Sequence, residues 1–350
     1  MIYVLLAILL SAIAYYFVFN GHNRQRNTNV LCAIFMFAIA AAKSIELSPV
    51  DDLINYKNMF LEAGSMEYSA IMEMGRKGDL KDPVFSVIAR FFYNLGFSVE
   101  AWMGMIALLF AVCFCYFVYK NSKNAWMSSL IMFAMYFSFT LTGLRQTMAL
   151  AFICLAFNCI MEKSPTKFVA FVIIAMLFHS SAILFLPAYL IARQKVGFKQ
   201  IIYIIVVFVV ANFFPDVFRT LIETFAWNEQ MSVYAERTVA LSWSGFIIAL
   251  AILVFCLYVR VNYQGNANFR RIDMLINLHV VSLCFLAMST VVAEAFRLSL
   301  YYSIGTAVLV PNMIALGNKK EKALLEFGIS IVFILYLFWS APYAAFTFFK

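Results

Sequence analysis

The chain has 350 residues, of which 64% are apolar and only 13% are charged. Ordinary soluble domains contain about 25% charged residues, and 26 basic plus 18 acidic side chains are too few to cover a soluble core of this size. The composition excludes a soluble enzyme and predicts an all-α, polytopic integral membrane protein. The net charge of +8 lies in short loops, so we interpret it as a topology signal and expect no nucleic-acid partner.

Apolar runs of membrane-helix type follow one another along the chain. They lie at residues 2–19, 29–42, 99–119, 125–143, 146–161, 168–192, 200–214, 243–260, 273–293, 298–317 and 324–345. A single crossing by 168–192 would place the basic loop 193–199 opposite the other basic loops, so we predict that this run turns near residues 179–181. The sequence thus predicts about 12 transmembrane segments, two of them short and broken, in a single domain over 1–350.

The charged residues distinguish the two membrane faces. Fifteen of the 26 basic residues lie in the loops 20–28, 120–124, 162–167, 193–199, 260–271 and 318–322. The long segments 43–98 and 215–242 are rich in acidic residues, and the positive-inside rule places them outside the cytoplasm. Within the first of them, residues 83–98 are too short to span, so we predict an amphipathic helix that lies in the outer interface.

Arg145 is the single charged residue between Ala125 and Ile160. An arginine in such a run is costly unless it reaches water, pairs or binds an anion. Because Arg145 and Gln146 open a helix inside the predicted bundle, we predict that they bind an anionic substrate. The alternative is a turn arginine whose side chain extends to the outer headgroups.

His179 lies at the predicted outer break, beside two serines. A histidine there is suited to act as a general base, to bind a sugar hydroxyl or, when protonated, to contact a phosphate. The alternative is a histidine that donates to a backbone carbonyl freed by the break. His279 lies in the middle of an apolar run, and we expect it to bond a neighbouring helix.

Glu294 and Arg297 have i,i+3 spacing, and Tyr301 follows one turn later. A local ion pair that closes the helical hairpin explains this spacing. A second arginine on the outer side also suggests an anion site shared with Arg145, because two guanidinium groups suit a pyrophosphate.

The outer segment begins with carboxylates and an aromatic ring, namely Asp51, Asp52 and Tyr56. Such side chains hold sugar hydroxyls and stack on sugar faces, although they are also common on solvated surfaces. The sequence contains no Gly-rich phosphate loop, zinc-binding helix motif or nucleophile elbow. We therefore expect no metal and no cofactor.

The order of these features resembles the EpsG family of bacterial polysaccharide polymerases, which are related in role to the Wzy O-antigen and capsule polymerases. The resemblance covers nearly the whole chain. It rests on Asp52 with Tyr56 and Phe60, Asp82-Pro83 before the amphipathic stretch, Arg145-Gln146, the block IAMLFHSSAILFLPAYL at 174–190, Arg297 with Tyr301-Tyr302 and Pro311, and APY near the end. The sequence departs from the family pattern where Pro49-Val50 replace a glycine before Asp51 and where Asp82 replaces a glutamate.

The resemblance implies glycosyl transfer on the extracytoplasmic face of the bacterial plasma membrane. The expected substrate is an undecaprenyl-pyrophosphate-linked oligosaccharide, whose repeat units are joined into a chain, and a chain-length regulator is the expected partner besides the bilayer. Arg145 and Arg297 would stabilise the leaving pyrophosphate, and His179 or Asp52 would take the proton of the acceptor hydroxyl. The resemblance adds Asp82 to the substrate-binding residues proposed above, which are Arg145, Gln146, Arg297, Glu294, Tyr301, Tyr56 and Asp51.

Two other functions remain open at this point. Broken helices and charges at membrane depth are also features of transporters, so a flippase for lipid-linked sugars is one alternative. A membrane O-acyltransferase, which would use a buried histidine such as His179 or His279, is the other. The predicted outer position of His179 argues against a cytoplasmic acyl donor.

Overall fold

The computed structural model describes residues 51–217, 220, 243–263, 269–292 and 294–340. Every regular element in these ranges is a helix, which confirms the predicted all-α class. Four helices there are long and apolar enough to cross a membrane, and shorter apolar helices accompany them. The predicted segments 2–19 and 29–42, most of the segment 215–242 and the side chains of Asp51 and Asp52 lie outside the described residues. The count of about 12 spans stays a prediction.

The described helices form two compact units. The first unit holds the described residues up to Ile183 and from Asn318 onward, and the second holds Leu184–Gly317. Two of the four candidate spans, Val99–Asn121 and Leu144–Met161, belong to the first unit, and the other two belong to the second. The single domain predicted over 1–350 stays a prediction.

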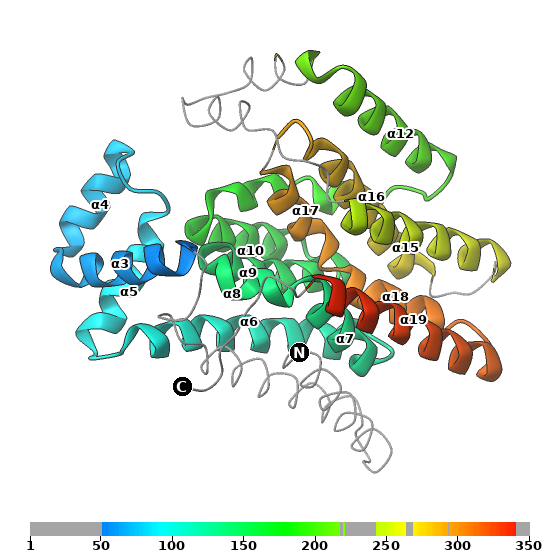
Figure 1. Ribbon diagram of the computed structural model, residues 1–350, viewed down its shortest axis with the longest axis horizontal. Helices are drawn as coiled ribbons and strands as arrows, with labels where there is room; N and C mark the ends of the chain where they lie inside the picture. Colours follow the sequence, from blue (N-terminus) through cyan, green and yellow to red (C-terminus); the bar gives the residue numbers. More distant parts are fainter. Residues whose placement is uncertain (1–50, 218–219, 221–242, 264–268, 293, 341–350) are drawn as a thin grey trace, which may run out of the picture. The chain divides into compact units, whose positions relative to one another are not determined.

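The first unit is organised around α9 (Leu144–Met161), which packs against α6 (Val99–Asn121) and α10 (Pro165–Phe178) (Figure 1). Most of the side chains along α9 are buried. A helix that is apolar on all sides is typically enclosed by other helices. Arg145 lies in the first turn of this central helix, so the packing of α9 determines where its guanidinium group lies.

The predicted segment 125–143 forms two helices, α7 (Ala125–Met135) and α8 (Phe137–Thr142), with a break at Tyr136. Tyr136 has φ −124° and ψ −22°, outside the helical region. The helix α19 (Lys319–Ser340) packs against α7.

Between residue 51 and α6, the described chain forms three helices that pack together (Figure 1). They are α3 (Asp51–Ser65), α4 (Tyr68–Lys77) and α5 (Pro83–Asn94). The ring of Trp102 at the start of α6 lies 5.1 Å from the ring of Phe60 and 5.3 Å from that of Phe85, centroid to centroid. The stretch predicted as an amphipathic helix therefore is a helix, α5, whose apolar side packs into this aromatic core; its location in the membrane interface stays a prediction.

The predicted break in the run 168–192 is confirmed. The helix α10 ends at Phe178, and His179 is extended, with φ −154° and ψ 108°. A 3₁₀-helix over Ser180–Phe185 follows, and then the single turn α11 (Ala188–Ile191). The part after the break is therefore more irregular than the half-length helix that we predicted.

The second unit is organised around α16 (Phe269–Met288). It packs against α12 (Phe198–Phe213), α15 (Trp243–Asn262), α17 (Ala295–Ser303) and α18 (Thr306–Ile314). In the middle of α16, His279 Nε2 donates to the carbonyl oxygen of Ala249 at 2.8 Å, and Nδ1 lies 3.0 Å from Thr306 Oγ1. This histidine joins α15 and α18 to α16, as the sequence predicted.

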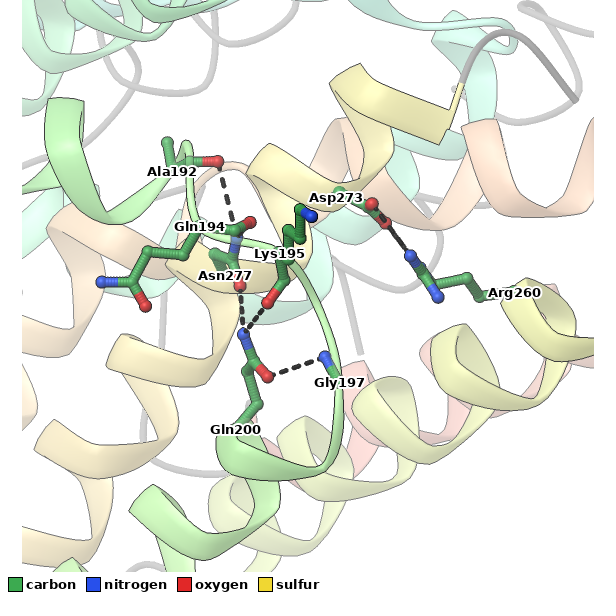
Figure 2. Close-up of polar contacts among 8 residues, drawn as sticks. All are labelled: Ala192, Gln194, Lys195, Gly197, Gln200, Arg260, Asp273 and Asn277. Atoms are coloured by element: carbon green, nitrogen blue, oxygen red, sulfur yellow. Dashed lines mark hydrogen bonds and ion pairs between the residues drawn. The ribbon is translucent and has the colours of Figure 1, made fainter. Parts of the chain in front are cut away.

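A buried amide network connects the loop before α12 to α16 (Figure 2). Asn277 Nδ2 donates to the carbonyl oxygen of Gln194 at 2.7 Å, and its Oδ1 accepts from Gln200 Nε2 at 2.9 Å. Gln200 Nε2 also donates to the carbonyl oxygen of Lys195 at 3.0 Å, and its Oε1 accepts from the N–H of Gly197 at 2.8 Å. The two amides thus satisfy loop backbone groups that would otherwise be buried without partners.

Replacing Asn277 by leucine is expected to lower the free energy of unfolding by roughly 2–4 kcal/mol, because it keeps the volume and leaves buried polar groups unpaired. Asn277 is 2% exposed. A fall in the thermal unfolding midpoint in detergent checks this prediction. The exposed Asn262, replaced in the same way, is the matched control and is expected to change little. Equal midpoints for the two variants would contradict this role of the network.

Candidate functional site

Asp82, Arg145 and His179 meet in the first unit, although they come from three separate segments. Asp82 Oδ2 lies 3.3 Å from Arg145 Nη1 and 3.2 Å from His179 Nδ1. Asp82 Oδ1 accepts a hydrogen bond from the backbone N–H of Ser180 at 3.0 Å. The carboxylate before α5 therefore joins the start of α9 to the break after α10, and these three residues form the candidate site.

The backbone of Asp82 aims its side chain at these partners. Asp82 is the N-cap residue of α5, but its side chain makes no capping bond to that helix. Its φ of 52° and ψ of 58° are left-handed, a region that costs free energy for residues with a Cβ and is best tolerated by asparagine and aspartate. A Cβ on Gly75 would lie 2.5 Å from the Pro83 ring, so this glycine allows α4 to approach α5 closely beside the site.

The Asp82 side chain is only 5% exposed, whereas those of Arg145 and His179 are 29% and 21% exposed. Burial by itself would raise the pKa of Asp82, but the hydrogen bond and charge of His179, the Ser180 N–H and the charge of Arg145 lower the pKa below its usual 3.8. Asp82 is therefore a carboxylate at neutral pH, and the two side chains beside it remain partly accessible.

The contact with Asp82 determines which nitrogen of the neutral His179 ring carries the hydrogen. A carboxylate only accepts hydrogen bonds, so Nδ1 carries the hydrogen and Nε2 keeps its lone pair. The alternative prediction from the sequence was that this histidine donates to a backbone carbonyl left unpaired by the helix break. The structure instead gives Nδ1 a carboxylate, which leaves Nε2 chemically suited to accept a proton.

Arg145 has donors beyond those that its neighbours use. Nη1 contacts Asp82 and also lies 3.5 Å from the carbonyl oxygen of Lys81. The Nε–H is buried and has no hydrogen-bond partner within the described part of the chain. A buried unpaired donor on a cation is costly. The side chain as a whole is 29% exposed, so an anion can approach this cation.

Other residues that the sequence proposed for the site lie in different settings. The ring of Tyr56 is partly buried and packs edge-on against Phe85 at 5.9 Å. Gln146, beside Arg145, is buried, and so is Tyr301. Their roles as substrate-binding residues stay predictions. Asp51 and Asp52 begin α3, but their side chains lie outside the described residues.

Glu294 and Arg297 belong to the second unit. Arg297 Nε lies 3.3 Å from Glu294 Oε2, so the local ion pair predicted from their spacing is present. The anion site shared by Arg145 and Arg297 stays a prediction.

The other end of α9 carries a second group of polar contacts. Lys120 Nζ lies 3.3 Å from Glu162 Oε1, and Asn121 donates to Asn158. These contacts join the end of α6 to the end of α9. The 18 residues of α9 correspond to a length of about 27 Å, so the Asp82 site and these contacts are separated by nearly the thickness of a hydrocarbon core.

The pH dependence of stability provides a test of Asp82. Its lowered pKa means that the carboxylate stabilises the fold above the ordinary value of 3.8, and that this contribution is lost as the pH falls through the lower folded-state pKa. The thermal unfolding midpoint of Asp82→Asn is therefore expected below that of the wild type at pH 7, with the difference shrinking below pH 3.8. The exposed Asp79→Asn variant should show no such difference. A difference that persists unchanged in acid would contradict this assignment.

Comparison with known proteins identifies the family of the chain. The sequence model of the EpsG family matches residues 28–350, which is nearly the whole chain. No protein of curated function and no solved structure matches the chain.

Proposed function

The chain belongs to the EpsG family of Wzy-type polysaccharide polymerases, and we propose that it joins polyprenyl-pyrophosphate-linked oligosaccharide repeat units on the extracytoplasmic face of the bacterial plasma membrane. The family and the apolar helices make it a membrane polysaccharide polymerase in general terms. The observation that carries the more specific proposal is the cluster of Asp82, Arg145 and His179, in which a partly exposed cation and a partly exposed histidine contact the same carboxylate.

In the proposed reaction, Arg145 binds the pyrophosphate of the donor. The leaving group gains negative charge as its bond to the anomeric carbon breaks, and a positioned guanidinium stabilises that charge. The partial exposure of the Arg145 side chain supports this role. We propose that the sugar residues of the donor extend from this point.

His179 is the proposed general base. The acceptor hydroxyl oxygen forms the new bond to the anomeric carbon, its proton passes to His179 Nε2, and the polyprenyl pyrophosphate departs with the electrons of the broken bond. Asp52 remains the alternative base, and Asp51 and Tyr56 remain proposed sugar ligands. In this scheme Arg145 stabilises the leaving group of the donor, and His179 accepts the proton of the acceptor.

The proposed topology has twelve passes, with the Asp82 site outside. The two groups of polar contacts at opposite ends of α9 support this topology, because the loops 120–124 and 162–167 at the far end are the basic ones. Asn124 in the first of these loops donates to Glu326 of α19 at 2.8 Å, close to the basic loop 318–322. These contacts support a common side of the membrane for three loops that we expect to be cytoplasmic.

We also propose that the reaction needs no metal. Within the described ranges, no group of three or more histidine, cysteine, aspartate or glutamate residues is placed to hold a metal ion. The direct check is activity of the purified protein in excess chelator, where loss of activity that Mg²⁺ or Mn²⁺ restores would contradict metal independence.

A deletion strain tests the proposed function in cells. Loss of a polymerase is expected to leave single repeat units on the lipid carrier at the outer leaflet, whereas loss of a flippase strands them on the cytoplasmic leaflet. Labelling of Ser180→Cys by a membrane-impermeant thiol reagent tests the outer position of the site, and the wild-type protein with its native cysteines is the background control. Labelling only after permeabilisation would contradict that position and favour a cytoplasmic reaction such as O-acyl transfer.

A further inference from the structure

The contacts of Asp82 indicate a task other than substrate binding. Its oxygens face Arg145, His179 and the Ser180 N–H, and its side chain is almost fully buried. We propose that Asp82 is a positioning residue that acts through His179: it fixes the ring in the form with hydrogen on Nδ1 and keeps Nε2 available for the acceptor proton. This inference rests on the proposed function of His179.

The backbone at Asp82 supports this assignment. An aspartate before a proline-initiated helix would ordinarily cap that helix through its side chain. Here the backbone is left-handed and the side chain makes no capping bond. The carboxylate instead bonds Arg145 and His179, which are 63 and 97 positions away along the chain. Strained backbone of this kind persists where the surrounding contacts determine it, and such positions concentrate at functional sites.

The Ser180 N–H contact orients the carboxylate as well as the histidine. It holds Oδ1 at the first residue after the break, so Oδ2 is left to face the His179 ring. When His179 takes the proton, the adjacent carboxylate stabilises the imidazolium that forms. The charge of Arg145, which contacts the same oxygen, keeps Asp82 ionised without donating a proton to it.

The Asp82→Asn variant tests whether Asp82 positions His179 or has only a structural role. Asp82→Asn keeps the length, the tolerance for left-handed backbone and an acceptor for the Ser180 N–H, but it loses the charge. With purified enzyme and the native lipid-linked repeat unit, kcat is expected to fall about 100-fold or more while the donor KM changes less than about threefold. Asp82→Glu, which restores a carboxylate, is expected to recover part of the loss, and Asp79→Asn is the matched control.

A double variant tests whether Asp82 acts through His179. In a His179→Gln background, Asp82→Asn is expected to reduce kcat by less than about threefold further, because residues that act as a unit are not additive. A full additional loss, or an Asp82→Asn enzyme with wild-type kcat, would overturn the proposal.

Nitrogen-15 NMR of histidine-labelled protein tests the ring directly and needs no turnover. The chain has three histidines, so the His179 signals are assigned by their loss in His179→Gln. At alkaline pH the wild type is expected to carry the hydrogen on Nδ1, and Asp82→Asn is expected to shift it toward Nε2. An unchanged ring form would overturn the inference. If the ring shifts as expected but the wild type forms no polymer, the proposed function fails and the positioning of the ring by Asp82 stands.

Discussion

Replacing Arg145 by alanine is expected to abolish polymer formation while the protein still folds. The substitution removes the cation proposed to stabilise the leaving pyrophosphate, and losing one such donor group costs about 10²–10³-fold in turnover. Arg145→Lys keeps the charge but lacks the planar fork of donors, so it should retain part of the activity. Polymer amount and length on a gel, at matched protein level, measure both effects.

Arg76→Ala is the matched control for Arg145. Arg76 is exposed in α4, in the same segment as Asp82, which we predict to be outside. Its loss should therefore leave polymer formation within about twofold of the wild type. Normal polymer in Arg145→Ala would refute the anion site and return Arg145 to the role of an arginine that extends to lipid headgroups.

His179→Gln is expected to lower kcat by about 10²–10⁴-fold, which is the usual contribution of a positioned general base. Binding of undecaprenyl pyrophosphate, measured in nanodiscs, should stay close to the wild-type value because Arg145 is intact. Loss of binding together with turnover would show instead that His179 holds the donor.

The buried His279 is the control for the partly exposed His179. His279→Gln disturbs bonds to Ala249 and Thr306, so the thermal unfolding midpoint should fall while turnover per folded molecule is retained. Loss of turnover without loss of stability in this variant would move the catalytic histidine to the second unit and contradict the proposed site.

The sequence selected all three residues of the candidate site, and two of them are conspicuous in their surroundings. Arg145 is the single charge in a long apolar run, and His179 lies where the charge balance of the loops requires a break. The structure brings both to Asp82. The sequence also selected Asp82, as a substrate ligand, but its burial and its contacts could not be read from a motif because they depend on a left-handed backbone and on partners far along the chain.

The break at Tyr136 and the burial of Gln146 and Tyr301 could not be predicted from the sequence pattern. The break at Tyr136 occurs without glycine or proline nearby, so tertiary packing overrides the apolar pattern there. Gln146 follows Arg145 in sequence, but consecutive residues point about 100° apart around a helix, and the packing of α9 buries the amide. Tyr301 is buried for the corresponding reason in α17, which packs against α16.

The most direct test of the proposed function is an in vitro reaction of the purified protein in nanodiscs with the native lipid-linked repeat unit. The account predicts a ladder of products on a gel that is present with wild type and Arg76→Ala and absent with Arg145→Ala. If intact substrate at the outer face yields no ladder, or if Arg145→Ala forms the same ladder as wild type, the proposed polymerase site is contradicted.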